Sequence, residues 1–422
     1  MSNPNRITPS NYPPNGTISY TGGSPLIVFN IGATNSMLLG RTIRFNGKIQ
    51  YSTGAGGIIG DSGVLLSNLG IFNALEQLSI SSNQTGVDIE TIRSYNRYLA
   101  SAFKSSDGLQ KQCNSSTIDN ICNPAIFSAS RILSADADSA GAGVDPNLLP
   151  FSCHLPCGLF SGDVPLSMDT TGGLTISIQI SPDSNMFYGA SATGKTNAQN
   201  CLYQLTDVHL TFEDRLMDPR EMSMPSMKFN SISTFSQVIS NNITNITKNF
   251  GLSNVLSVFM NFVPQININN YNENGMDTSI FLDSNDDADL IKRVNFFKAG
   301  VKHPIQFDIE TFNNDNHQLS TELAREFKQC FTNNINTASE CYRSQVNSPN
   351  NSYIVDVDTA WNFGIGVNYD MISNIGANFA QDQWSCLIEK TSLTPKPYNA
   401  YIFIKAVNTI NFNKNGNISI DT

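Results

Sequence analysis

Hydrophobic and polar residues alternate strictly over several short stretches of this chain. In residues 174–180, LTISIQI, the four aliphatic side chains share one face of an extended strand and Thr, Ser and Gln share the other. Residues 207–212, DVHLTF, repeat the alternation. A period of two residues indicates a sheet with one packed face and one wet face, which is typical of antiparallel sandwiches.

The same pattern predicts further strands along the chain. They fall at residues 26–31, 43–51, 74–81 and 305–310, and in a C-terminal hairpin whose arms, 410–412 and 418–420, flank the turn Asn415-Gly416. Residues 235–263 are ambiguous, because their apolar residues have helical spacing while their β-branched content disfavours a helix.

Two amphipathic helices are predicted in the connections. Residues 88–103 place Ile89, Ile92, Leu99 and Phe103 on one face, with Asp88 as the N-cap. Residues 319–331 form the second predicted helix, and residues 104–148, rich in Ser, Asp, Asn and Gly, are interpreted as an exposed insertion between strands.

The strand pattern divides the chain into two similar halves. Residues 1–25 are rich in Pro, Asn and Gly and are expected to form an extended arm. Residues 214–228 interrupt the alternation and concentrate charge, so we place a linker there, between a first sandwich at 26–213 and a second at 229–422. The predicted fold is therefore all-β: two tandem eight-stranded jelly-roll sandwiches with short helices in the connecting loops.

Composition narrows the classes of function. Charged residues are 14% of the 422 residues, well below the roughly 25% of an average soluble domain, so the surface suits close contact with other proteins. The net charge of −10 and the absence of a Lys/Arg cluster argue against specific nucleic-acid binding. Residues 1–10 do not read as a signal peptide, no apolar run is long enough to span a membrane, and the eight cysteines are expected to be reduced.

One segment matches a nucleotide-binding motif. Residues 189–196, GASATGKT, fit the P-loop pattern, which requires a buried strand before it and a helix after it so that backbone amides cradle phosphate. Here residues 181–185 interrupt the upstream strand, and residues 197–201 are too few for a helix before the next strand. We therefore interpret the segment as a loop that connects strands, and keep a P-loop nucleotide-binding protein only as an alternative.

Candidate metal and catalytic residues are sparse. Cys153, His154 and Cys157 invite a zinc interpretation, but no second ligand pair has metal spacing, so buried thiols and a surface imidazole are expected. Cys113 and Cys122 could pair under oxidising conditions, and the aspartates at 283, 286, 287 and 289 lack the ligand order of a calcium loop. With four scattered histidines and no nucleophile elbow, we predict no catalytic, cofactor-binding or metal-binding residues, and no enzyme activity.

Several segments, in order, resemble the double jelly-roll major capsid proteins of eukaryotic double-stranded DNA viruses, of the virophage, polinton-like and nucleocytoplasmic large DNA virus type. They are Leu75–Ile80 with Gly86–Ile92 and Ser94–Asn96, Leu149–Ile180, Tyr203–Asp218, Val294–Gly300 with Pro304-Ile305, Phe363–Gly366, and Tyr401–Ile420. The similarity covers most of residues 26–422, and the chain looks like a compact member of the family.

The resemblance implies a structural role. A homotrimer of two-sandwich subunits would form a hexon-like, pseudo-hexameric capsomer that tiles an icosahedral shell. Its partners would be other copies of the chain, neighbouring capsomers, penton and minor capsid proteins, and an internal membrane where the virion has one. The protein would be located in the virion after assembly in the host cytoplasm or nucleus. A carbohydrate-binding β-sandwich that acts in attachment is the other alternative, because it would share the alternation and the Asn-rich surface.

Overall fold

The computed structural model describes most of both halves of the chain. The described residues are 7–15, 19–23, 25–53, 64–66, 70–105, 148–162, 165–189, 192–216, 226–271, 291–303, 308–310, 330, 364–370, 375–390, 395–412 and 418–422. No helix in these ranges is long and apolar enough to cross a membrane.

Strands dominate both halves. The first half contains β1 (Ile7–Tyr12), β2 (Tyr20–Thr21), β3 (Leu26–Ile31), β4 (Ser36–Leu38), β5 (Arg44–Thr53), β6 (Val64–Leu66), β7 (Leu75–Ser82), β8 (Asp88–Arg93), β9 (Leu148–His154), β10 (Leu166–Ser167), β11 (Leu174–Ile180), β12 (Phe187–Gly189) and β13 (Cys201–Leu216). The second half contains β14 (Ser226–Ile239), β15 (Ile243–Asn249), β16 (Val255–Pro264), β17 (Ile291–Lys298), β18 (Val301–His303), β19 (Ile309–Glu310), β20 (Ile365–Asn368), β21 (Gln383–Lys390), β22 (Tyr398–Phe412) and β23 (Ile418–Asp421).

Helices are short and lie in the connections. They are α1 (Tyr95–Ser105), α3 (Gly158–Ser161) and α4 (Ala192–Ala198), with 3-10 turns η1 (Gly40–Thr42), η2 (Gly70–Ala74), η4 (Asp183–Asn185) and η5 (Gln265–Asn267).

The first sandwich packs a seven-stranded sheet against a four-stranded one. The larger sheet has the order β10-β4-β13-β5-β9, with β1 and β2 also paired to β13, and the smaller has the order β3-β11-β7-β8; β6 and β12 form a separate pair. All pairs are antiparallel. The rings of Phe29 on β3 and Phe45 on β5 meet across the core with centroids 6.2 Å apart.

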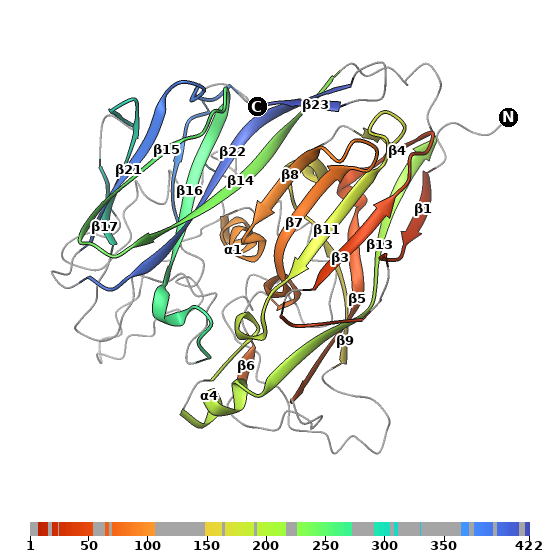
Figure 1. The fold of residues 1–422 in the computed structure, drawn as a ribbon, viewed down its shortest axis with the longest axis horizontal. Coiled ribbons are helices and arrows are strands. Elements are labelled where there is room, and N and C mark those ends of the chain that lie inside the picture. Colours follow the sequence, from red (N-terminus) through yellow and green to blue (C-terminus); the bar gives the residue numbers. More distant parts are fainter. Residues whose placement is uncertain are drawn as a thin grey trace, which may run out of the picture.

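The second sandwich is built from two five-stranded antiparallel sheets. One has the order β14-β22-β16-β20 with β23 added to β22, and the other β15-β21-β17-β18 with β19 added to β17. The β17–β18 hairpin turns through Ala299 and Gly300, whose φ angles are 48° and 80°. Two positive φ values suit the right-handed twist of a tight hairpin. Figure 1 shows the two sandwiches side by side.

The sequence-based fold is confirmed: two antiparallel sandwiches in tandem, with helices confined to connections. The strand predicted at 174–180 is β11, and those at 26–31, 43–51 and 74–81 correspond to β3, β5 and β7 within two residues. The predicted hairpin at 410–420 is formed by the pairing of β22 and β23. β13 ends at Leu216 and β14 begins at Ser226, both inside the predicted linker.

The helix predicted at 88–103 is wrong over its first turns. Residues 88–93 are strand β8, which pairs with β7, and the helix begins only at Tyr95, after Ser94 with a φ of 50°. Ile89 and Ile92 are both buried, but by sheet contacts that a three-residue spacing does not reveal. Asp88 is therefore no N-cap.

The ambiguous segment 235–263 forms strands of β14, β15 and β16, and not a helix. Residues 255–263 of β16 are all buried, because both faces of this sheet are covered. A strand covered on both faces loses its alternation. The predicted strand at 305–310 is described only from residue 308, and the predicted helix at 319–331 and the insertion at 106–147 lie outside the described residues.

Candidate functional site

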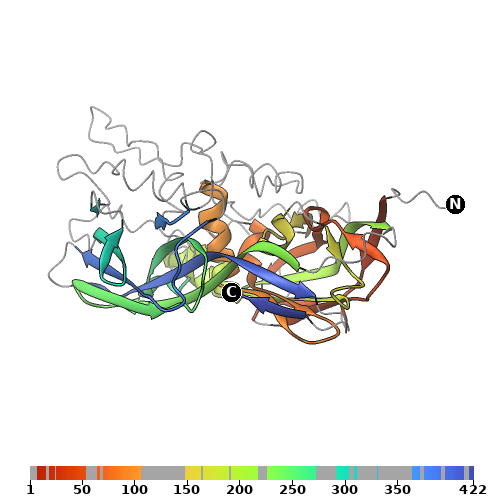
Figure 2. The ribbon, with the colours of Figure 1, turned by 90° about the horizontal axis from the view of Figure 1, so that it is seen from above.

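The core of the first sandwich continues into the junction between the sandwiches, where Tyr98 of the first half meets Phe259 and Phe403 of the second. Helix α1 leaves the first sandwich at the end of β8 and stands between the two sets of strands (Figure 2). Its residues 95–102 are all buried. The helix packs on the outer face of the sheet that contains β16 and β22, and this is why that sheet is covered on both sides.

Aromatic rings form the apolar part of the junction. Tyr98 on α1 lies 5.9 Å from Phe403 on β22 and 6.2 Å from Phe259 on β16, measured between ring centroids. Phe259 and Phe403 themselves stack at 5.2 Å with a 24° angle between their planes. Each aromatic pair contributes about 0.5–1.5 kcal/mol beyond the area that it buries. The cluster therefore fixes the helix of one sandwich against the sheet of the other.

Polar contacts cross the same interface. The Asn261 side chain on β16 donates through Nδ2 to the carbonyl of Arg97 and to Oγ of Ser101, each at 3.0 Å. The guanidinium carbon of Arg97 lies 4.5 Å above the centre of the Tyr401 ring. These contacts satisfy groups that the junction buries and give α1 a defined position along β16.

Glu90 ties three separate segments together. Its side chain on β8 is buried, with 3% of the residue exposed. Oε1 accepts from the backbone N–H of Gly158, at 3.0 Å, and from that of Ile232, at 2.8 Å, while Oε2 accepts from Leu159 at 2.9 Å. Gly158 and Leu159 open helix α3 of the first sandwich, whereas Ile232 belongs to β14 of the second. One carboxylate thus links both sandwiches.

Gly158 is required by the closeness of the two backbones. A Cβ atom at this position would lie 1.7 Å from the carbonyl oxygen of Asn230 on β14, so no other residue fits without moving the strand. The preceding Cys157 is the N-cap of α3, and its Sγ accepts from the N–H of Phe160 at 3.4 Å.

Burial controls the protonation of the groups at the junction. Burial raises the pKa of Glu90, although the three backbone N–H groups oppose the shift. Burial and the neighbouring Glu90 raise the pKa of the Cys157 thiol, which is therefore a protonated, unreactive group. The donors that hold the carboxyl group are the three backbone N–H groups and the Cys157 thiol.

The raised pKa of Glu90 predicts a pH dependence of stability. The folded chain binds the Glu90 proton more tightly than the unfolded chain, so this contribution is complete below about pH 4.3 and is lost as the pH rises through the folded pKa. Comparing the free energy of unfolding of the parent and Glu90→Gln between pH 4 and 8 should show the difference falling with pH, by at most about 1.4 kcal/mol per unit. A difference that grows with pH would contradict it.

The three residues that were weighed as zinc ligands are all buried, so the thiols lie as predicted, but His154 is not the surface imidazole that the sequence suggested. His154 on β9 is buried, and burial together with Arg44 and Arg41 lowers its pKa to about 4, so the ring is neutral. Cys153 and Cys157 are buried thiols that form no disulfide among the described residues, and Cys157 caps α3. Within the described ranges, no three His, Cys, Asp or Glu side chains gather closely enough to hold a metal ion. Cys113, Cys122 and the aspartates at 283–289 lie outside the described residues.

The P-loop-like segment corrects one sequence-based expectation. Strand β12 precedes it and helix α4 follows, so the statement that no helix fits is wrong. The seven residues of α4 include Gly194, Lys195 and Thr196, which therefore lie inside the helix and not ahead of it. A Cβ on Gly189 would lie 2.0 Å from the backbone nitrogen of Lys195. This direct backbone contact occupies the space in which a P-loop would hold phosphate.

The remaining histidines are scattered. His209 lies half-exposed on β13, with Nδ1 2.8 Å from the carbonyl oxygen of Asp207. His303 packs against the Tyr369 ring, with centroids 4.9 Å apart. Among the described contacts, neither histidine lies beside a nucleophile. The Glu90 carboxylate at the junction is held by three N–H donors, an arrangement that suits a structural link between the two sandwiches.

Sequence reasoning missed the junction. It placed Glu90 in the first turn of a helix, because an acidic residue is favoured there. Its partners Leu159 and Ile232 are 69 and 142 residues away, so no local pattern could reveal them. The local sequence held no clear signal, because Glu90 stands among Asp88, Thr91 and Arg93 in a segment that mixes polar and apolar residues.

No protein-family model and no curated protein sequence matches this chain. Comparison with solved structures does find matches that span both sandwiches. The Vp54 capsid protein of PBCV-1, as fitted into the virophage Sputnik, has a TM-score of 0.58 at 10% identity, covering 99% of this chain and 97% of that protein.

Two further capsid proteins are similar in structure. The Faustovirus major capsid protein has a TM-score of 0.56 at 9% identity, covering 97% of this chain and 90% of its own. The mavirus major capsid protein has a TM-score of 0.53 at 10% identity, covering 98% and 90%. The chain therefore has the double jelly-roll fold, as its resemblance to the family implied.

Proposed function

We propose that this chain is a major capsid protein. The observation that carries the proposal is the likeness to viral capsid proteins over 97–99% of the chain, which includes both sandwiches in the same order. The junction supports it, because a shell subunit must keep two sandwiches in a fixed relation. The role is structural, not enzymatic, and the protein is located in the virion.

The proposed assembly is a homotrimer. Three subunits with two sandwiches each present six similar lobes, so threefold symmetry gives a nearly hexagonal block that tiles a shell. Residues 26–213 and 229–422 are the proposed lobes, joined through 214–228 and preceded by the arm at 1–25. Neighbouring capsomers, penton and minor capsid proteins are the proposed further partners, with assembly in the host cytoplasm or nucleus.

Light scattering and electron microscopy test this assembly. The purified protein is expected at three times the 46.1 kDa of the chain at micromolar concentration, with hexagonal outlines in negative stain. A stable monomer with round outlines would contradict the proposal. The attachment alternative predicts no such trimer, so the same two measurements separate it from the capsid role.

A further inference from the structure

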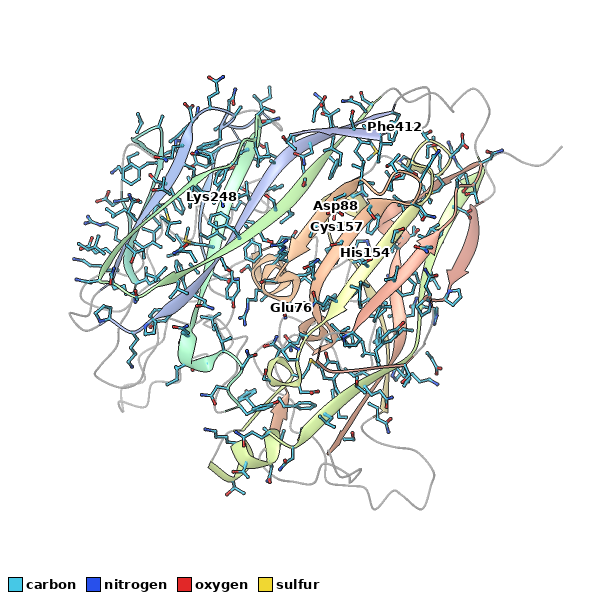
Figure 3. The ribbon with its side chains drawn as sticks, in the orientation of Figure 1. Glu76, Asp88, His154, Cys157, Lys248 and Phe412 are labelled. Carbon is cyan, nitrogen blue, oxygen red and sulfur yellow. The ribbon has the colours of Figure 1, made fainter. Side chains whose placement is uncertain are left out.

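A cavity of about 540 Å³ lies between the sandwiches, beside the junction. Its lining includes Glu76, Gln77 and Arg93 from the first sandwich, with Phe235 and Tyr401 from the second. The volume is within the range of about 300–1,000 Å³ that is typical of small-molecule sites. Figure 3 labels Glu76 between the two sets of strands.

The Glu76 carboxylate is held in position from one side. Oε2 accepts from the side-chain amides of Asn96, at 3.1 Å, and Asn185, at 3.4 Å. Oε1 has no hydrogen-bond partner among the described residues. A carboxylate fixed through one oxygen, with the other available in a cavity, is a pre-oriented acceptor for a ligand hydroxyl.

The amides and the rings complement this acceptor. Gln77 on β7 and Gln179 on β11 are paired in register, so their half-buried amides are neighbours on the same face of the sheet. Both supply donors and acceptors. The half-buried Tyr401 and the buried Phe403, two residues apart on β22, form the apolar wall on the opposite sandwich. The lining therefore combines groups that can bind ligand hydroxyls with an apolar surface on which ligand C–H groups can pack.

The lining disfavours other classes of ligand. A phosphate would meet the Glu76 carboxylate, and a lipid would leave the polar groups unpaired. Because Glu76 and Arg93 offset each other in charge, a neutral ligand fits best. We propose that this cavity binds a neutral mono- or disaccharide.

This inference goes beyond the capsid role and does not depend on the trimer. It gives the protein a glycan-binding site that uses both sandwiches, so a shell built from it would adhere to glycans through an open cavity. Failure of saccharide binding leaves the proposed assembly untouched, and a monomeric protein could still bind sugar. The two proposals therefore fail separately.

Saturation-transfer NMR on the full chain tests it, with methyl glycosides of glucose, galactose, mannose and N-acetylglucosamine as probes. We expect at least one probe to bind, and Glu76→Gln to weaken it roughly ten-fold or more, because hydrogen bonds to charged groups are strong. Ser236→Phe, at an exposed lining residue, should block binding by filling the cavity. Glu213→Gln, at an exposed glutamate on β13, is the matched control.

Thermal melting of each variant shows whether a loss of binding is caused by a loss of folding. No binding of any probe to the parent protein would overturn the proposal. Binding that survives both Glu76→Gln and Ser236→Phe would also overturn it, because the sugar would then lie elsewhere. Loss in both variants, with the Glu213→Gln control unchanged, supports it.

Discussion

Ile178→Asp is expected to prevent the first sandwich from folding, whereas Gln179→Asp is expected to change stability by about 1 kcal/mol or less. Ile178 is fully buried on β11, between Ile27 of β3 and Leu78 of β7. An unpaired carboxylate there costs several kcal/mol, a large share of the roughly 5–15 kcal/mol of a typical domain. Gln179 points to the opposite face and is half-buried beside the cavity.

Soluble expression and thermal melting of the two variants distinguish them. The neighbouring positions share one strand and differ only in the face that they occupy, so each variant is the control for the other. If Ile178→Asp melted like the parent, residue 178 would not face a core, and the sandwich built on this strand would be wrong.

The alternation that identified β11 shows what the sequence can predict. A strand with one buried and one half-exposed face gives a hydrophobic pattern with a period of two, as in LTISIQI. The predicted ends of this strand, residues 174 and 180, are those of β11 in the structure. The same rule failed at β16, where VLSVFMNFV is buried on both faces. Phe259 faces α1 and Val258 the core of the second sandwich, so the pattern carries no period.

Residues 88–93 show a second limit of prediction from local sequence. Ile89 and Ile92 have the spacing of one helix face, but both are buried in β8, whose register with β7 shifts next to Ile89, so local spacing favoured the wrong element. Pairing with β7 decides the outcome. The junction was equally hidden, because the contacts of Glu90 depend on how two sandwiches pack, which is a property of the whole chain.

Glu90→Ala is expected to destabilise the protein by roughly 3–5 kcal/mol, because it breaks a buried hydrogen-bond network. The truncation leaves the N–H groups of Gly158, Leu159 and Ile232 without their acceptor, and each buried, unpaired donor costs about 1–3 kcal/mol. Removal of a desolvated carboxyl offsets part of this loss. Because Ile232 lies on the second sandwich, the two halves should also melt less cooperatively.

Differential scanning calorimetry measures both effects. The parent should unfold in one transition, and Glu90→Ala in a broader or divided one at lower temperature. Glu90→Gln should lie between them, since its amide oxygen still accepts while its NH₂ group cannot. Asp88→Ala, at an exposed position of the same strand, is the matched control and should stay within about 0.5 kcal/mol. A Glu90→Ala protein that unfolds in one transition at the parent's temperature would mean that the aromatic and polar contacts of α1 suffice to hold the sandwiches together.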